Sequence, residues 1–136
     1  MAIQGGAMLR PLAVMMRRQI RTISPDATLA EAAGLMREAK VGAVLVHAGG
    51  SYLGVVSEAD LVRKAMALGL DPARTEVRAV MSSPVITIEI DRSAHEASDL
   101  MAEKGIRHLA ITQDGAIVGM ISVRDLLRYF KNWGTL

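Results

Sequence analysis

One sequence pattern occurs twice in this chain of 136 residues, and it constrains the fold more than any other feature. Residues 54–63 return as residues 119–128, an offset of 65 (119 − 54). At that offset the match continues without a gap from 16–66 to 81–131, and it keeps helix caps, turn glycines and apolar positions together. Such self-similarity is the signature of a repeated structural unit. The sequence therefore predicts a tandem duplication.

Each copy predicts an amphipathic helix near its start. Thr28 is followed three positions later by Glu31, and Ser93 is followed in the same way by Glu96. A hydroxyl residue with glutamate at this spacing forms a capping box, in which each side chain bonds the backbone N–H of the other residue. Because apolar residues at helical spacing follow each box, we expect helices there.

Short strands surround each of these helices. We expect strands at 22–23, 43–47 and 53–56 in the first copy and at 85–88, 108–112 and 118–121 in the second. The pair Asp114-Gly115 predicts a type I′ hairpin turn, because both residues tolerate a positive φ. A second helix should follow each hairpin, over 57–68 and 122–132. The order strand, helix, hairpin, helix places the chain in the α/β (α+β) class.

Composition and charge limit the classes of protein. An apolar content of 51% can fill a hydrophobic core, and a net charge of +2 gives little support to nucleic-acid binding. Cysteine is absent, which excludes disulfides, thiolate metal sites and a cysteine nucleophile. We expect neither a membrane span nor a signal peptide, and hence a cytoplasmic protein. We expect a flexible N-terminal arm (1–10), repeat 1 (11–70) and repeat 2 (71–136).

The motif Ser-x-x-Asp ends the last strand of each copy, as Ser57 with Asp60 and as Ser122 with Asp125. Its simplest role is a further capping box. However, we expect the shorter aspartate to reach back to the cap less well than glutamate and to project its carboxylate above the strand ends. A helix N-terminus suits a phosphate, and a nearby carboxylate suits the two hydroxyls of a ribose. The motif therefore points to a nucleotide.

These motifs together resemble those of a tandem pair of cystathionine-β-synthase (CBS) domains, called a Bateman module. The resemblance covers about residues 11–133 and includes both Gly-apolar-apolar-Ser-x-x-Asp segments, the segment 23–32 and Gly-Ile-Arg-His-Leu at 105–109. It implies a β-α-β-β-α fold in each repeat, pseudo-twofold symmetry with two clefts between the repeats, and a homodimer. It also implies adenosine-containing ligands, commonly AMP, ADP or ATP and sometimes S-adenosylmethionine or NAD.

The resemblance assigns residues to each cleft, with aspartate on the ribose, apolar side chains on the adenine, and Arg, His and Ser on the phosphates. Cleft one would contain Val55, Ser57, Asp60, Ser83, Val85, Ile106, Arg107 and His108. Cleft two would contain Arg18, Ile20, Val41, Gly42, Ala43, Met120, Ser122, Arg124 and Asp125. Since Arg107 and His108 correspond to the uncharged Gly42 and Ala43, we expect cleft one to bind a phosphorylated ligand more tightly.

We expect a regulatory module, with no catalytic activity and no catalytic cofactor. The sequence contains no triad-like arrangement, no Walker loop and no metal-ligand spacing. An adenine nucleotide would act as a regulatory ligand that alters contacts to an effector protein, which the sequence does not identify. Two other classes are open. One is a structural adaptor with empty clefts, and the other is a nucleic-acid binder that uses Arg17, Arg18, Arg21, Arg63 and Lys64.

Overall fold

The computed structural model describes residues 11–133 and contains two compact units. One unit contains residues 21–85, and the other contains residues 86–133 together with residues 11–20. We name them the Asp60 unit and the Asp125 unit, after the aspartate of the motif that each contains. Residues 11–20 therefore fold with the second sequence repeat, although they precede the first. The expected arm at 1–10 lies outside the described residues.

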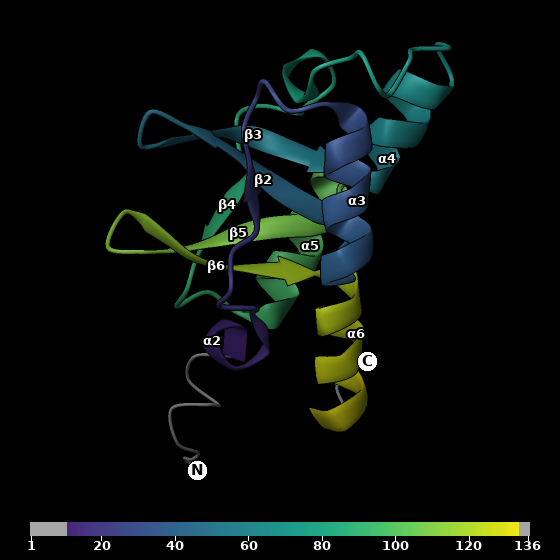
Figure 1. The fold of residues 1–136 in the computed structure, drawn as a ribbon. Helices are drawn as coiled ribbons and strands as arrows, with labels where there is room; N and C mark the ends of the chain where they lie inside the picture. Colours follow the sequence, from purple (N-terminus) through teal and green to yellow (C-terminus); the bar gives the residue numbers. More distant parts are fainter. Residues whose placement is uncertain (1–10, 134–136) are drawn as a thin grey trace. The chain divides into compact units, whose positions relative to one another are not determined.

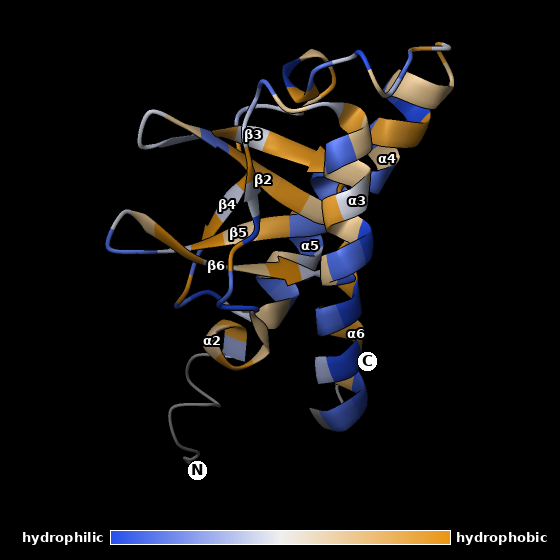
Figure 2. Cartoon of the chain, in the orientation of Figure 1, coloured by the Kyte–Doolittle hydropathy of each residue, from blue (hydrophilic) through white to orange (hydrophobic). Residues whose placement is uncertain are grey.

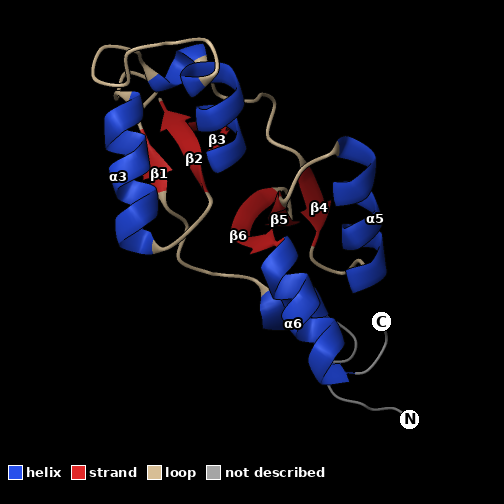
Figure 3. Ribbon diagram, turned by 90° about the vertical axis from the view of Figure 1, so that its right-hand side faces the viewer, coloured by secondary structure: helices blue, strands red, loops and turns tan. Residues whose placement is uncertain are grey.

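The Asp60 unit is built on a three-stranded sheet (Figure 1, Figure 3). Its elements are β1 (Thr22–Ile23), α3 (Leu29–Ala39), β2 (Ala43–Ala48), β3 (Ser51–Ser57), α4 (Glu58–Asp60), the π-helix η1 (Leu61–Met66) and the 3-10 helix η2 (Val77–Ala79). β1 is parallel to β2, and β2 is antiparallel to β3. The predicted strand, helix and hairpin are confirmed, whereas the helix predicted over 57–68 is divided into α4 and η1.

The Asp125 unit has the same topology. Its elements are α2 (Pro11–Met15), β4 (Thr87–Glu89), α5 (Ala94–Lys104), β5 (His108–Gln113), β6 (Ala116–Ser122) and α6 (Val123–Trp133). The strand order is β4-β5-β6, with the same parallel and antiparallel pairings. The register is also the same, because Ala43 pairs with Ser57 in one unit and His108 pairs with Ser122 in the other. The predicted α/β fold is therefore confirmed in both copies.

Capping hydrogen bonds form at the N-termini of α3 and α5, as the sequence predicts. At α3, the Glu31 N–H donates to Thr28 Oγ1 at 3.1 Å, and the Thr28 N–H donates to Glu31 Oε1 at 2.9 Å. Ser93 and Glu96 form the equivalent capping box at α5, with both distances 3.0 Å. The turn between β5 and β6 has φ angles of 52° and 80° at its two central residues, which is the backbone that a type I′ turn requires.

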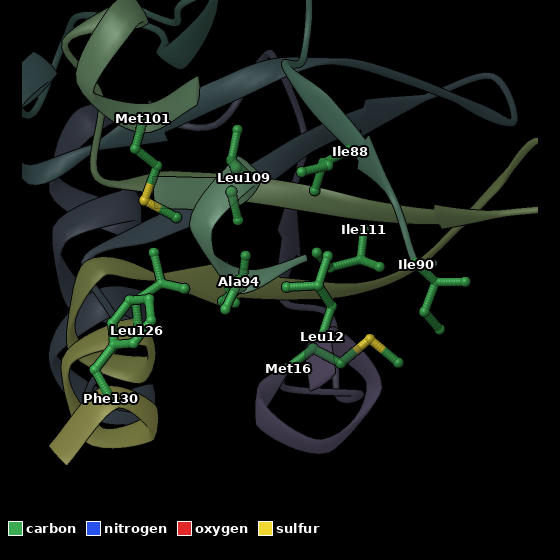
Figure 4. Packing of buried hydrophobic residues seen from close by; sticks show 12 residues of the cluster. Leu12, Met16, Ile88, Ile90, Ala94, Met101, Leu109, Ile111, Leu126 and Phe130 are labelled. Atoms are coloured by element: carbon green, nitrogen blue, oxygen red, sulfur yellow. The ribbon is translucent and has the colours of Figure 1, made fainter. Parts of the chain in front are cut away.

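Each unit has its own cluster of buried apolar side chains. In the Asp125 unit, Leu12 from α2, Met101 from α5 and Phe130 from α6 gather on the sheet (Figure 4). In the Asp60 unit, Leu29 and Val56 belong to the corresponding cluster. Figure 2 shows β2 and β5 as largely apolar, and α3 and α6 as alternating between apolar and hydrophilic residues. This alternation is what a helix with one buried face requires.

Candidate functional site: two Ser-x-x-Asp motifs

Both Ser-x-x-Asp motifs lie where a strand passes into a helix. Ser57 is the last residue of β3, and Ser122 is the last residue of β6. The Glu58 N–H donates to Gly42 O at 2.9 Å, and the equivalent bond of 2.9 Å forms in the Asp125 unit. Each serine is therefore held at the edge of its sheet, beside the first residues of the neighbouring strand.

Both aspartates form complete capping boxes. The Ser57 N–H donates to Asp60 Oδ2 at 2.9 Å, and the Asp60 N–H donates to Ser57 Oγ at 3.2 Å. Ser122 and Asp125 make the same two bonds at 2.9 and 3.2 Å. The expectation that aspartate reaches the cap less well than glutamate is therefore wrong. The extended backbone at Ser57 (φ −119°, ψ 167°) keeps its N–H within reach of the shorter side chain.

A second chain segment is joined to each motif by a backbone bridge. Val55 exchanges N–H···O bonds of 2.9 and 2.8 Å with Ser82, and Met120 exchanges bonds of 2.9 and 2.8 Å with Arg17. A glycine precedes each bridged strand residue, and a Cβ on Gly54 would lie only 2.6 Å from Ser82 O. The glycine of each motif is therefore needed for the close approach of another backbone.

The predicted site residues are divided between the two units. The Asp60 unit contains Val41, Gly42, Ala43, Val55, Ser57, Asp60, Ser83 and Val85. The Asp125 unit contains Arg18, Ile20, Ile106, Arg107, His108, Met120, Ser122, Arg124 and Asp125. The structure thus brings each motif together with its bridging segment. The predicted combinations of Asp60 with Arg107 and of Asp125 with Ala43 draw on both units and stay predictions.

The second carboxylate oxygen of Asp60 accepts hydrogen bonds from two further donors. Asp60 is 6% exposed, and its Oδ1 accepts from Lys64 Nζ at 3.0 Å and from Ser82 Oγ at 3.0 Å. Lys64 also donates to Val80 O at 3.3 Å. The buried negative charge is therefore paired within its own unit. Sequence analysis did not assign Lys64 or Ser82 to this site, although the i,i+4 spacing of Asp60 and Lys64 was a signal for an ion pair.

Asp125 is also 6% exposed, but its hydrogen bonds differ from those of Asp60. Its Oδ2 accepts from the N–H of Ser122 at 2.9 Å and from the hydroxyl of Ser122 at 3.0 Å. Among residues 11–133 no hydrogen bond or ion pair reaches its Oδ1. The repeat offset places Tyr129 at the position that lysine occupies beside Asp60. The two aspartates, which are alike in sequence, therefore differ in the acceptor capacity that they have left.

The three arginines predicted to bind phosphate all lie in the Asp125 unit, and their side chains are exposed: Arg18, Arg107 and Arg124. His108 is half-buried. Arg18 Nη2 donates to Ala13 O at 3.5 Å. Exposed guanidinium groups can contact a phosphate through two parallel N–H donors.

No three His, Cys, Asp or Glu side chains of residues 11–133 gather as ligands of one metal ion. None of the helices in the same range combines the length and the apolar surface that crossing a bilayer requires.

Comparison with known protein families matches residues 12–67 and residues 77–132 to the CBS domain. Each matched segment contains one Ser-x-x-Asp motif. The chain belongs to the CBS domain family. The resemblance seen in the sequence is thereby confirmed, and the two α/β units are those of a tandem CBS pair.

Known CBS proteins are similar to this chain over most of its length. The CBS domain-containing protein YhcV of Bacillus subtilis (strain 168) is 36% identical over 111 residues, which span 82% of this chain and 79% of YhcV. The chain spans only 58% of the length of a relative from Methanopyrus kandleri. A solved structure of a protein with CBS domains from Burkholderia ambifaria MC40-6 has a TM-score of 0.83 and 31% identity, and the match covers 88% of each chain.

A solved structure of a similar CBS protein contains AMP. The CBS domain protein PAE2072 from Pyrobaculum aerophilum, complexed with AMP, has a TM-score of 0.74 and 28% identity to this chain. The match covers 83% of this chain and 87% of PAE2072. A CBS protein of similar length and fold therefore binds an adenine nucleotide.

Proposed function

We propose that this chain is a regulatory module that binds an adenosine-containing nucleotide (AMP, ADP or ATP) and communicates its binding state to a partner protein. The nucleotide acts as a regulatory ligand and not as the cofactor of a reaction. A ligand shifts a conformational equilibrium only by the difference in its affinity for the two states. The regulated partner must therefore distinguish the nucleotide-bound conformation from the free one.

The proposal is supported by membership of the CBS family and by the AMP complex of PAE2072. The observation that carries it is the carboxylate of Asp125, which is buried in the first turn of α6 and has an oxygen that no described residue bonds. Buried polar groups in native proteins are nearly always hydrogen-bonded, so we expect a ligand to donate a hydrogen bond to this oxygen. A ribose supplies two hydroxyl donors. The partial positive charge at the start of the helix favours the phosphate of the same ligand.

Thermal denaturation with candidate ligands tests the proposal. AMP, ADP, ATP, S-adenosylmethionine and NAD are added separately to the purified protein. At about one hundred times its dissociation constant, a ligand stabilises the native state by about 2.7 kcal/mol, which raises Tm by roughly 9 °C for a chain of this length. The double variant Asp60→Asn/Asp125→Asn keeps the size of both side chains, and it should lose this shift. The absence of any shift with the wild-type protein would contradict the proposal.

The complete capping boxes favour a second function, that of a structural adaptor whose motifs only stabilise helix ends. An adaptor would show no ligand-dependent change in Tm. Its double variant would be less stable than the wild type both with and without AMP. The same melting experiment therefore separates the adaptor from the nucleotide sensor.

Assembly and cell compartment belong to the same proposal. We propose that repeat 1 (11–70) and repeat 2 (71–136) form one Bateman module, that two such chains form a homodimer, and that the protein acts in the cytoplasm. Size-exclusion chromatography with light scattering measures the mass in solution. A mass of one chain at micromolar concentration would contradict the dimer.

A further inference from the structure

Lys64 distinguishes the two Ser-x-x-Asp motifs. Its ammonium group has three N–H donors, and they are directed at Asp60 Oδ1 (3.0 Å), Val80 O (3.3 Å) and Ser82 Oγ (3.0 Å). The hydroxyl of Ser82 donates in turn to Asp60 Oδ1 at 3.0 Å. The carboxylate of Asp60 therefore accepts two bonds at each oxygen, the other two coming from Ser57. Such a carboxylate has no acceptor site left, because it offers about four in total.

The motif of the Asp125 unit has neither of these additional donors. Asp125 accepts two bonds, both at Oδ2 and both from Ser122. The residue one helical turn after Asp125 is Tyr129, whose phenol side chain is not a cation. In the backbone bridge to β6, Arg17 stands at the position of the serine that bonds Asp60. Asp125 therefore keeps an unused oxygen and an unpaired charge among the residues that the structure describes.

We propose that Lys64 closes the Asp60 motif to a ribose diol, so that the chain binds its nucleotide at the Asp125 motif alone. This inference rests on the proposed function, because it states which of the two motifs performs it. This order of nucleotide affinity, with the Asp125 motif above the Asp60 motif, is opposite to the one expected from the charges of Arg107 and His108. It follows from which hydrogen-bond acceptors are available and not from the number of nearby cations.

The chemistry of the ribose hydroxyls gives the reason. At Asp60, the hydroxyls would have to displace a charged donor, and hydrogen bonds from charged donors are roughly twice as strong as those from neutral donors. A displaced Lys64 would also lose its bonds to Val80 and Ser82. At Asp125 the same hydroxyls meet an oxygen to which no residue among 11–133 donates, so no described donor has to be displaced. The same motif therefore presents two different surfaces to one ligand.

Isothermal titration calorimetry with AMP, repeated with ATP, tests the inference on the full chain. The wild-type protein should bind one nucleotide per chain. Asp125→Asn should weaken binding by about tenfold or more, whereas Asp60→Asn should change the dissociation constant by less than about threefold. Lys64→Met keeps the aliphatic stem and removes the ammonium group, so it should create a second site that Asp60→Asn abolishes. Arg63→Met, at the exposed cation next in sequence, is the matched control and should leave a single site.

Two outcomes would overturn the inference and leave the proposed function intact. One is binding that is lost in Asp60→Asn and retained in Asp125→Asn, and the other is two nucleotides per wild-type chain. The absence of binding in the wild type and in every variant would instead remove the proposed function, and the inference with it. Circular dichroism checks that Lys64→Met folds. If it does not, the comparison of Asp60→Asn with Asp125→Asn still decides between the two motifs.

Discussion

Replacing Gly54 by alanine should destabilise the Asp60 unit by about 2–4 kcal/mol. The added Cβ would lie 2.6 Å from Ser82 O and 3.2 Å from both Met81 Sδ and Ser83 Cβ. Because the closest atom is a backbone oxygen, a side-chain rotation cannot relieve the contact. The segment around Ser82 would have to move away from β3.

Two effects set the size of this loss. Forcing an extra methyl group into a packed site costs about 1–3 kcal/mol. Movement of the segment also weakens the two hydrogen bonds between Val55 and Ser82, each of which contributes about 1 kcal/mol. For a chain of 136 residues, 1 kcal/mol corresponds to roughly 3–4 °C in Tm. We therefore expect the Tm of Gly54→Ala to fall by roughly 7–14 °C.

Urea denaturation followed by circular dichroism measures the free energy of unfolding, with two other glycines for comparison. Gly34 lies exposed in α3 with no atom within 4 Å of a built Cβ, so Gly34→Ala should stabilise the protein by about 0.5–1 kcal/mol. At Gly119 the closest atom, at 2.6 Å, is the flexible Met16 Sδ, and Arg17 O lies at 2.9 Å, so Gly119→Ala should cost less than Gly54→Ala. Equal stability of Gly54→Ala and the wild type, within about 0.5 kcal/mol, would refute the argument.

Two further predictions concern helix caps and the core. The pKa of Glu31 lies below its ordinary value of 4.5 because the Thr28 N–H donates to its carboxylate, and the pKa of Glu96 is lowered by the equivalent bond. A carboxyl whose pKa is lowered by folding stabilises the native state above its unfolded-state pKa, and this stabilisation is lost as the pH falls through the folded-state value. Tm should therefore decrease below about pH 4.5, and it should decrease less in Glu31→Gln/Glu96→Gln; an unchanged pH profile would contradict the role of these bonds. Leu12 is 0% exposed and Val14 is 56% exposed, so Leu12→Ala should cost about 2–5 kcal/mol by urea denaturation and Val14→Ala less than about 0.5 kcal/mol. Equal losses would show that α2 does not pack with residues 86–133.

Much of the fold could be predicted from the sequence because its signals lie within a few consecutive residues. Contacts between neighbours in the chain form the capping box of Thr28 and Glu31, and they also form the turn at Asp114 and Gly115. The structure confirms both. The change from a period of 3.6 to a period of two marked the passage from helix to hairpin. The division of the second helix into α4 and η1 was missed, because the two differ in their backbone hydrogen bonds, and the six residues of η1 are too few for apolar spacing to separate a π-helix from an α-helix.

The candidate site could be predicted in part. Ser57 and Asp60 stand together in the sequence, and the structure confirms that they are joined at the end of β3. The donor Ser82 was missed, because it lies 22 residues from Asp60 and reaches it only through the backbone bridge to Val55. Long-range contacts of this kind depend on the path of the whole unit and leave no periodic signal.

By itself, the sequence determined that one α/β unit is present twice, where its helices begin, and that each copy ends its last strand in a serine and an aspartate. These features are encoded in composition, period and spacing along the chain. Only the tertiary structure decided that residues 11–20 fold with the second copy and that each shared glycine lies against another backbone segment. It also decided that Lys64 forms an ion pair with Asp60, whereas Asp125 has no such partner among the described residues. The physical reason is that two identical motifs acquire different electrostatic surroundings from residues that the fold, and not the motif, brings to them.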